Sequence, residues 1–225
     1  MIQSLKAQFF AYPLDFCSHF FLLLPVAFAG YRRKFLTVPL LVISIYFIVR
    51  FLEELVFLYY ALLVKNNHSE INGAIILDIL IVGQFYYLSF TSHMFSRRIT
   101  VWITVLGFLV ALVNFVTDGP TSVSWPTLRL IMIILSLTYF NRILSENRVR
   151  KILLHTSFWI SAGFLFYGMG TFMTSIFSVY LTEASKETYD LFSNMDQLLS
   201  VLFSILVATG LWVSKFDKEN YIQFA

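Results

Sequence analysis

The chain has 225 residues, of which 58% are hydrophobic and 13% charged, and its formal net charge is +3. Soluble domains contain about 45–50% apolar and about 25% charged residues, so the composition excludes an ordinary soluble domain. The basic excess does not indicate a nucleic-acid partner either, because the basic residues form short clusters between apolar segments, as orientation in a membrane requires. The lipid bilayer is therefore the first partner that we expect.

The apolar residues occur in long blocks separated by short polar connections. A helix needs about 20 mostly apolar residues to cross the hydrocarbon core of a bilayer. We predict an all-α membrane protein, a single seven-helix domain over residues 1–225. The predicted spans are 9–31, 35–64, 73–96, 99–117, 125–144, 152–181 and 188–214. No cleavage pattern follows the N-terminal segment, so we expect the first span to be retained.

The Lys and Arg residues are divided unevenly between the two sets of connections that alternate along this chain. Cytoplasmic connections carry an excess of basic residues, and here one set holds eleven while the other holds three. We therefore predict an N-terminus outside and a cytoplasmic C-terminus. The eleven are Arg32, Arg33, Lys34, Arg97, Arg98, Arg142, Arg148, Arg150, Lys151, Lys215 and Lys218, and the three are Lys6, Lys65 and Lys186.

The second predicted span contains the stretch "YFIVRFLEELVFLYY", with Arg50, Glu53 and Glu54 inside an apolar run. If these charges marked a loop, residues 35–49 would form a helix only about 22 Å long, which is too short to cross. The charge bias between the connections would also be lost. We therefore predict one long helix over 35–64 with the three charges in its interior.

The spacing of the three charges allows local pairing, since Arg50 can meet Glu53 at i+3 or Glu54 at i+4 on one helix face. One guanidinium cannot neutralise both carboxylates. An unpaired charge in hydrocarbon costs several kcal/mol, so the surplus carboxylate must bind a proton, reach water or find a cation on another helix.

The predicted topology brings further polar residues to the outer half of the bundle, and Arg129 is the cation that we expect to offset Asp78. Two interpretations remain: a closed ion-pair network that locks the helices, or an outward-opening pocket that binds a small ligand, an ion or a proton and responds to pH. The candidate residues are Arg50, Glu53, Glu54, Asp78, Arg129, Asp15, His19, Gln84 and Asp196.

Motifs for known chemistry are missing from the sequence. Cys17 is the single cysteine, the four histidines are scattered, and we find no H-E-x-x-H, G-x-S-x-G or P-loop pattern. We therefore expect no cofactor, no metal site and no catalytic residue. The favoured function is a non-enzymatic, receptor-like sensor that acts through a protein partner. The alternatives are a small proton- or ion-coupled transporter, and an intramembrane enzyme with a carboxylate dyad.

The sixth span, "FWISAGFLFYGMGTFMTSIFSVY", carries small residues near one face. Such residues permit close helix packing in lipid, and glycines also lower helix stability. The pattern therefore favours a packed helix, with a mobile helix as the alternative.

The last two spans, with "FWISAGFLFYGMG" followed by "NMDQLLSVLFSILVATGLW", resemble those of small, uncharacterised seven-span membrane proteins of Bacteroidota-type bacteria. The resemblance implies a bacterial cytoplasmic (inner) membrane and a signalling context, and it implies no activity.

Overall fold

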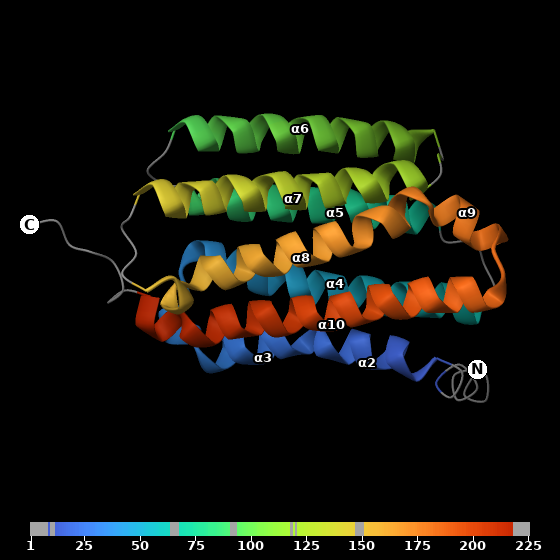
Figure 1. The fold of residues 1–225 in the computed structure, drawn as a ribbon, viewed down its shortest axis with the longest axis horizontal. Coiled ribbons are helices and arrows are strands. Elements are labelled where there is room, and N and C mark those ends of the chain that lie inside the picture. Colours follow the sequence, from blue (N-terminus) through green and yellow to red (C-terminus); the bar gives the residue numbers. More distant parts are fainter. Residues whose placement is uncertain are drawn as a thin grey trace, which may run out of the picture.

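The computed structural model describes residues 9, 12–63, 68–90, 94–117, 119, 121–146 and 151–217. These residues form helices and connections, and none of them lies in a β-strand. Helices α2 and α3 together form the first rod, followed by six further long helices (Figure 1). The helices are α2 (Pro13–Phe21), α3 (Leu23–Tyr31), α4 (Val38–Leu62), α5 (His68–Ser89), α6 (Met94–Val116), α7 (Thr121–Glu146), α8 (Thr156–Ile176), the short α9 (Ser178–Glu183) and α10 (Lys186–Asp217).

The rods pack in the order of the chain, and α10 closes the bundle by packing against α2 and α3 as well as α8. Helix α7 also contacts α5, whereas α6 packs on α5 and α7 at one edge (Figure 1). We call the end of the bundle where α2 begins the α2 end. Helices α4 and α8 end there and α5, α7 and α10 begin there, while α10 finishes at the opposite, Asp217 end (Figure 1).

Within the described residues, five helices are long and apolar enough to cross a membrane: the α2–α3 rod, α5, α6, α7 and α10. Helix α4 is as long but carries three charges, and α8 is rich in glycine and small polar residues. Large apolar side chains cover the outer surface; on α6, Trp102 is 67% exposed and Val113 62% exposed. Contiguous apolar surface of this kind suits contact with lipid.

The first predicted span is two helices rather than one. The chain turns at Leu22, and Pro25 lies in the first turn of α3. Proline lacks the N–H that would continue the hydrogen-bond pattern of a preceding helix, which explains the break.

The predicted boundary between the third and fourth spans is wrong. Helix α5 ends at Ser89 and α6 begins at Met94, so the basic residues Arg97 and Arg98 lie inside the first turns of α6. The Arg97 guanidinium lies 4.1 Å from the ring centroid of Tyr87, which lets a charged side chain remain within the helix.

Two other boundaries also differ from the prediction. The segment 117–126 is not a loop throughout, because α7 begins at Thr121 and includes Pro126. The predicted span 152–181 is interrupted, since α8 ends at Ile176 and α9 follows. By contrast, α4 runs without interruption through its three charges, as predicted. The basic residues that lie outside the described residues are Lys6, Lys65, Arg148, Arg150 and Lys218.

Buried aromatic rings fill the centre of the bundle. Tyr46 and Phe47 of α4 contact Phe164 of α8 and Phe203 of α10, with ring centroids 5.7 Å apart for Tyr46–Phe164 and 5.1 Å for Phe47–Phe203. All four are at most 3% exposed. We call these four residues the aromatic layer. Tyr46 precedes Arg50 by about one helical turn, so the layer lies on the Asp217 side of the charged triplet.

Helix α8 packs closely on both neighbours through its glycines. A Cβ at Gly163 would lie 3.0 Å from Phe203 of α10, and one at Gly168 would lie 3.3 Å from the Arg129 carbonyl oxygen of α7. The packing interpretation of the small residues in α8 is confirmed at these positions.

Candidate functional site

Arg50 is the centre of a cluster of acidic side chains. Its Nη1 donates to Glu53 Oε2 at 3.1 Å and to Asp78 Oδ2 at 3.3 Å, and its Nη2 donates to Glu54 Oε1 at 2.9 Å. The local pairs follow from the i,i+3 and i,i+4 spacing. The pair with Asp78 also joins α4 to α5.

One guanidinium does not satisfy the three carboxylates. The second oxygens, Glu53 Oε1 and Asp78 Oδ1, are buried and have no hydrogen-bond partner among the described residues. The Asp78 side chain is 1% exposed and the Arg50 side chain 13%. A buried, incompletely paired carboxylate is costly, so this cluster is not a fully closed ion-pair lock.

A second chain of polar contacts runs from α4 through α2 to α10. His19 Nε2 lies 3.2 Å from Glu54 Oε2 and 3.7 Å from Asp15 Oδ1. Gln197 Nε2 on α10 donates to Asp15 Oδ1 at 3.1 Å. Asp15 and His19 share a helix face because they are four residues apart. Glu54 contacts Arg50 through one carboxylate oxygen and His19 through the other.

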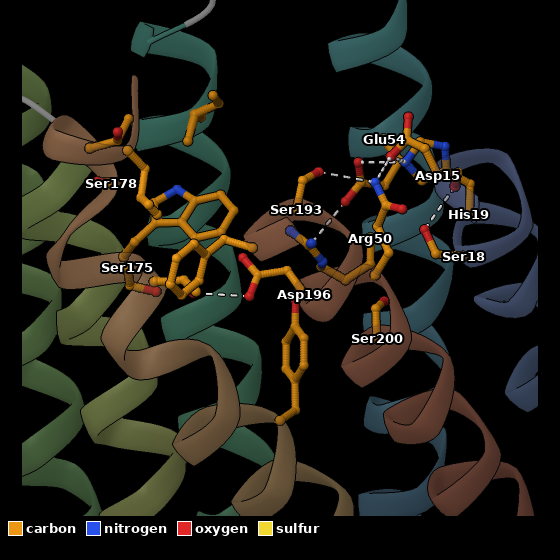
Figure 2. A pocket seen from close by; sticks show the side chains of 18 of the residues that line it. Asp15, Ser18, His19, Arg50, Glu54, Ser175, Ser178, Ser193, Asp196 and Ser200 are labelled. Carbon is orange, nitrogen blue, oxygen red and sulfur yellow. Dashed lines mark hydrogen bonds and ion pairs between the residues drawn. The ribbon is translucent and has the colours of Figure 1, made fainter. Parts of the chain in front are cut away.

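These side chains border a cavity of about 330 Å³ at the α2 end, which we call the polar cavity. Helices α2, α4, α5, α7, α8, α9 and α10 all contribute to its wall. In Figure 2, Asp196 lies between Ser175 and Arg50, and Asp15, His19 and Glu54 lie on the far side of Arg50. The charged and titratable lining residues are Asp15, His19, Arg50, Glu54 and Asp196.

Asp196 reaches the polar cavity from α10. Its Oδ1 accepts a hydrogen bond of 2.9 Å from the hydroxyl of Thr174 on α8. No cation lies within ion-pair distance of Asp196 among the described residues. It is therefore the carboxylate of the cavity that is best placed to bind an incoming cation.

Arg129 lies near enough to Asp78 to offset part of its charge, as expected, but the ion pair of Asp78 is with Arg50. Arg129 is buried at 3% exposure, and its guanidinium lies 4.3 Å from the ring centroid of Tyr167 and 5.1 Å from that of Trp125. Its Nη2 also donates to the Tyr167 hydroxyl at 3.2 Å. Both α4 and α7 pack on α5, and the rotation of α4 about its axis places Arg50 beside Asp78.

Arg129 nevertheless lies close to the cluster. Both Arg129 and Asp78 line a cavity of about 10 Å³, and Arg129 Nε and Asp78 Oδ1 each lack a hydrogen-bond partner in the described part of the chain. A cavity of this size has room for about one water molecule.

Gln84 does not belong to the site, contrary to the prediction. Its side chain is exposed on α5 and lines none of the cavities at the α2 end. Six residues separate it from Asp78, which places it about 120° away around the helix. The position of Gln84 along α5 therefore did not indicate the direction of its side chain.

Several residues of the site gave no signal in the sequence. Trp125, Tyr167, Tyr189 and Phe192 line the polar cavity, but the chain contains 25 Phe, 12 Tyr and 4 Trp. One aromatic residue among so many does not reveal a cavity.

A separate polar chain lies at the Asp217 end. His155 Nδ1 lies 2.8 Å from Asp217 Oδ1, and His155 Nε2 lies 2.8 Å from the Tyr139 hydroxyl. These contacts connect the end of α10 with α7 and with the start of α8. The separation of Tyr139, His155 and Asp217 along the chain gave no sign of this connection.

The chemical character of the α2 end follows from its charges. Around Arg50 and the polar cavity, Asp15, Glu53, Glu54, Asp78 and Asp196 provide five carboxylates, whereas Arg50 and Arg129 provide two guanidiniums. With His19 neutral, full ionisation leaves an excess of three negative charges, which protons or a cation must offset. In the described residues no group of three His, Cys, Asp or Glu is placed to hold a metal ion.

No protein-family model, curated protein or solved structure matches this chain.

Proposed function

We propose that the protein is a receptor-like sensor with seven membrane-spanning helices. Its polar cavity faces outside and takes up positive charge, as a proton or a small cation. The helices that line the cavity pass the resulting change to a cytoplasmic or membrane protein partner. The basic connection 141–151 and the segment after 214 are the candidate contact sites for that partner. The bacterial inner membrane, which the resemblance implies, is the proposed location.

The observation that carries this proposal is the excess of carboxylates around the polar cavity. Asp196 and Glu54 come from different helices and border the same space. Ionisable residues inside a membrane protein mark ligand, ion or proton sites by default, because their burial is costly. A cation that binds in the polar cavity reduces the repulsion between these carboxylates. Binding of a cation is therefore favoured.

The aromatic layer supports a sensor over a carrier. Tyr167, which lines the polar cavity, stacks on Phe203 with ring centroids 5.0 Å apart and planes 2° apart. Phe203 in turn packs on Phe47 and Phe164. The aromatic layer thus lies next to a residue of the cavity wall and is apolar, whereas transport requires a path for charge through the bundle.

Helices α8 and α10 are the elements best suited to pass on a change. Each contributes residues to the polar cavity, including Thr174 and Asp196, whose hydrogen bond joins them. The same two helices meet again at the Asp217 end through His155 and Asp217. A cation that draws Asp196 away from Thr174 would shift α10 relative to α8. This shift would extend from the polar cavity to the contact between His155 and Asp217.

The test uses the full chain in lipid nanodiscs with Cys17→Ser and Ser214→Cys. Ser214 is buried near the Asp217 end, so its thiol-labelling rate reports on packing far from the cavity. Because the thiolate is the reactive form, each rate is divided by that of a small free thiol at the same pH. We expect methylammonium chloride, or a lower pH, to change this relative rate compared with sodium chloride at equal ionic strength. The matched variant with Asp196→Asn should lose the methylammonium response.

A second measurement separates the candidate functions. Uptake of methylammonium into proteoliposomes, above that of empty liposomes, would instead indicate the ion-coupled transporter. A labelling rate that changes with neither methylammonium nor pH would contradict the sensor.

A further inference from the structure

Basic residues from two helices meet at the Asp217 end, opposite the polar cavity. Arg32 follows α3 directly, and Arg33 and Lys34 lie in the short 3₁₀ turn that leads to α4. Lys215 lies in the last turn of α10, which packs along α3 (Figure 1). We call these four residues the basic cluster.

Aromatic rings from both helices hold Arg32 in place. Its guanidinium carbon lies 4.2 Å from the ring centroid of Trp212 on α10 and 5.1 Å from that of Tyr31 on α3. The two rings stack on each other, with centroids 5.8 Å apart and planes 12° apart. Phe28 packs edge-on against Trp212 at 5.5 Å. Because a ring face attracts a cation, these contacts fix one positive charge at the junction of α3 and α10.

The charges of the basic cluster are not offset by acidic side chains of the described residues. In that part of the chain, no carboxylate lies within ion-pair distance of any member of the cluster. The carboxylate of Asp217, two residues after Lys215, instead contacts His155 at 2.8 Å. The cluster therefore differs from the site around Arg50, where carboxylates are in excess, and it is suited to an anion from outside the chain.

The junction of α3 and α10 lies on the outer surface of the bundle, where a lipid can reach it. Tyr31 is 71% exposed and Trp212 42% exposed. Tyr and Trp are enriched at the level of the lipid headgroups, because their rings are apolar and their tips are polar. Toward the middle of the bundle the surface of α3 becomes apolar, with Leu23 exposed. A headgroup at Arg32 would thus leave its hydrocarbon chains against α3.

We propose that the basic cluster binds the phosphate of an anionic lipid headgroup, with Arg32 at its centre. The N–H groups of a guanidinium form a fork that matches the oxygens of a phosphate. Arg33, Lys34 and Lys215 add positive charge around that fork, and basic pockets between helices are suited to anionic headgroups. The phosphate connects the segment after α3 with the last turn of α10. This inference goes beyond the proposed function and does not depend on the polar cavity.

A second basic pair at the same end of the bundle provides an internal comparison. Arg97 and Arg98 lie in the first turns of α6, and Arg97 also lies over an aromatic ring, that of Tyr87. This pair supplies two charges from one helix, whereas the basic cluster supplies four charges from two. Arg98 is exposed, so its removal lowers the charge of this end without touching the junction of α3 and α10.

The test compares phosphatidylglycerol with phosphatidylcholine, both with dioleoyl chains, on the full chain in a non-ionic detergent. Each lipid is titrated, and native mass spectrometry gives the Kd of the first bound lipid. The key variant is Arg32→Gln, and the matched control is Arg98→Gln. Lys215→Gln tests the same site from α10 and leaves the ring contacts of Arg32 in place.

We expect the parent protein to bind phosphatidylglycerol more tightly than phosphatidylcholine. Arg32→Gln should weaken the binding of phosphatidylglycerol about tenfold, since a guanidinium fork is lost, and should leave that of phosphatidylcholine unchanged. Lys215→Gln should weaken it about threefold, because a single exposed lysine contributes charge alone. Arg98→Gln should bind both lipids as the parent does.

Three results would overturn the lipid site. The first is equal affinity of the parent for the two lipids. The second is an equal loss in Arg32→Gln and Arg98→Gln, which would show a general attraction to positive charge. The third is displacement of phosphatidylglycerol by inorganic phosphate but not by chloride at equal ionic strength, which would show a site for free phosphate.

The variant on α10 keeps the test decisive if Arg32→Gln does not fold. In that case Lys215→Gln is compared with Arg98→Gln, and equal affinities of these two variants for phosphatidylglycerol would overturn the site. None of these results bears on methylammonium binding at Asp196, so the lipid site and the sensor succeed or fail separately.

Discussion

Arg50 on α4 and Asp78 on α5 are joined by a hydrogen bond of 3.3 Å between Nη1 and Oδ2, and the Asp78 side chain is almost fully buried. The same Nη1 donates to Glu53. Because two carboxylates share one nitrogen, the charge of Arg50 is what allows both to remain within the bundle. The folded state should therefore depend strongly on this side chain.

We expect Arg50→Met to destabilise the protein by an amount on the order of 3 kcal/mol, since it leaves buried carboxylates without their cation. The measurement is the midpoint of thermal unfolding in detergent, together with the yield of monodisperse protein. Arg33→Met is the control, because Arg33 is exposed.

A double variant shows whether charge is the cause. Adding Asp78→Asn to Arg50→Met removes one of the uncompensated charges and should recover part of the lost stability. If the double variant is no more stable than Arg50→Met alone, the loss comes from packing rather than from charge.

The pH dependence of amine binding follows from competition for the same carboxylates. Protons and an ammonium ion both offset the negative charge around Asp196 and Glu54, so the affinity for methylammonium should fall as the pH is lowered. Titrations over a series of pH values measure this. In Asp196→Asn the remaining affinity should depend less on pH, and an affinity that rises on acidification would contradict a carboxylate site.

The sequence was informative about depth and about contacts within one helix. The pairs of Arg50 with Glu53 and Glu54 were predictable because a helix places i+3 and i+4 side chains together. The gathering of Asp15, His19, Asp78 and Asp196 at one end followed from the topology alone, since each lies near the same end of its predicted span.

The rotation of each helix about its axis was not predictable from the sequence. It decides whether Arg50 or Arg129 meets Asp78, and it turns Gln84 away from the cluster. In an amphipathic soluble helix the apolar face reveals this rotation, but lipid-facing and core-facing residues are both apolar here. Trp125 and Tyr167 line the cavity, but their direction could not be predicted either, because an apolar pattern on all faces does not reveal the rotation of a helix.

Arg129 should behave differently from Arg50 when its charge is removed. It contacts the rings of Tyr167 and Trp125 instead of a carboxylate, so we expect Arg129→Gln to cost less stability than Arg50→Met. Removing a positive charge near the polar cavity should also raise the affinity for methylammonium, by about twofold to tenfold. Titration of both variants and the parent checks this, and a decrease in affinity would show that Arg129 supports the site rather than opposing a cation.

Helix α8 should not tolerate larger side chains where it meets α7. A Cβ at Gly168 would lie 3.3 Å from the Arg129 carbonyl oxygen, whereas a Cβ at Gly30 on α3 would meet no atom within 4 Å. We expect Gly168→Leu to destabilise the protein by about 1–3 kcal/mol, as overpacking does, and Gly30→Leu to have little effect. Thermal unfolding of the two variants provides the comparison, and equal midpoints would show that α8 can move away from α7 at little cost.

The orientation of the bundle can be tested because the chain has one native cysteine. Lys186 begins α10 at the α2 end, and Lys34 lies at the opposite end between α3 and α4; both are exposed. In a Cys17→Ser background, we expect Lys186→Cys to react with a membrane-impermeant maleimide in intact spheroplasts. Lys34→Cys should react only after permeabilisation, because the basic connections are predicted to face the cytoplasm. The reverse pattern would place the polar cavity on the cytoplasmic side, so that its ligand would have to come from within the cell.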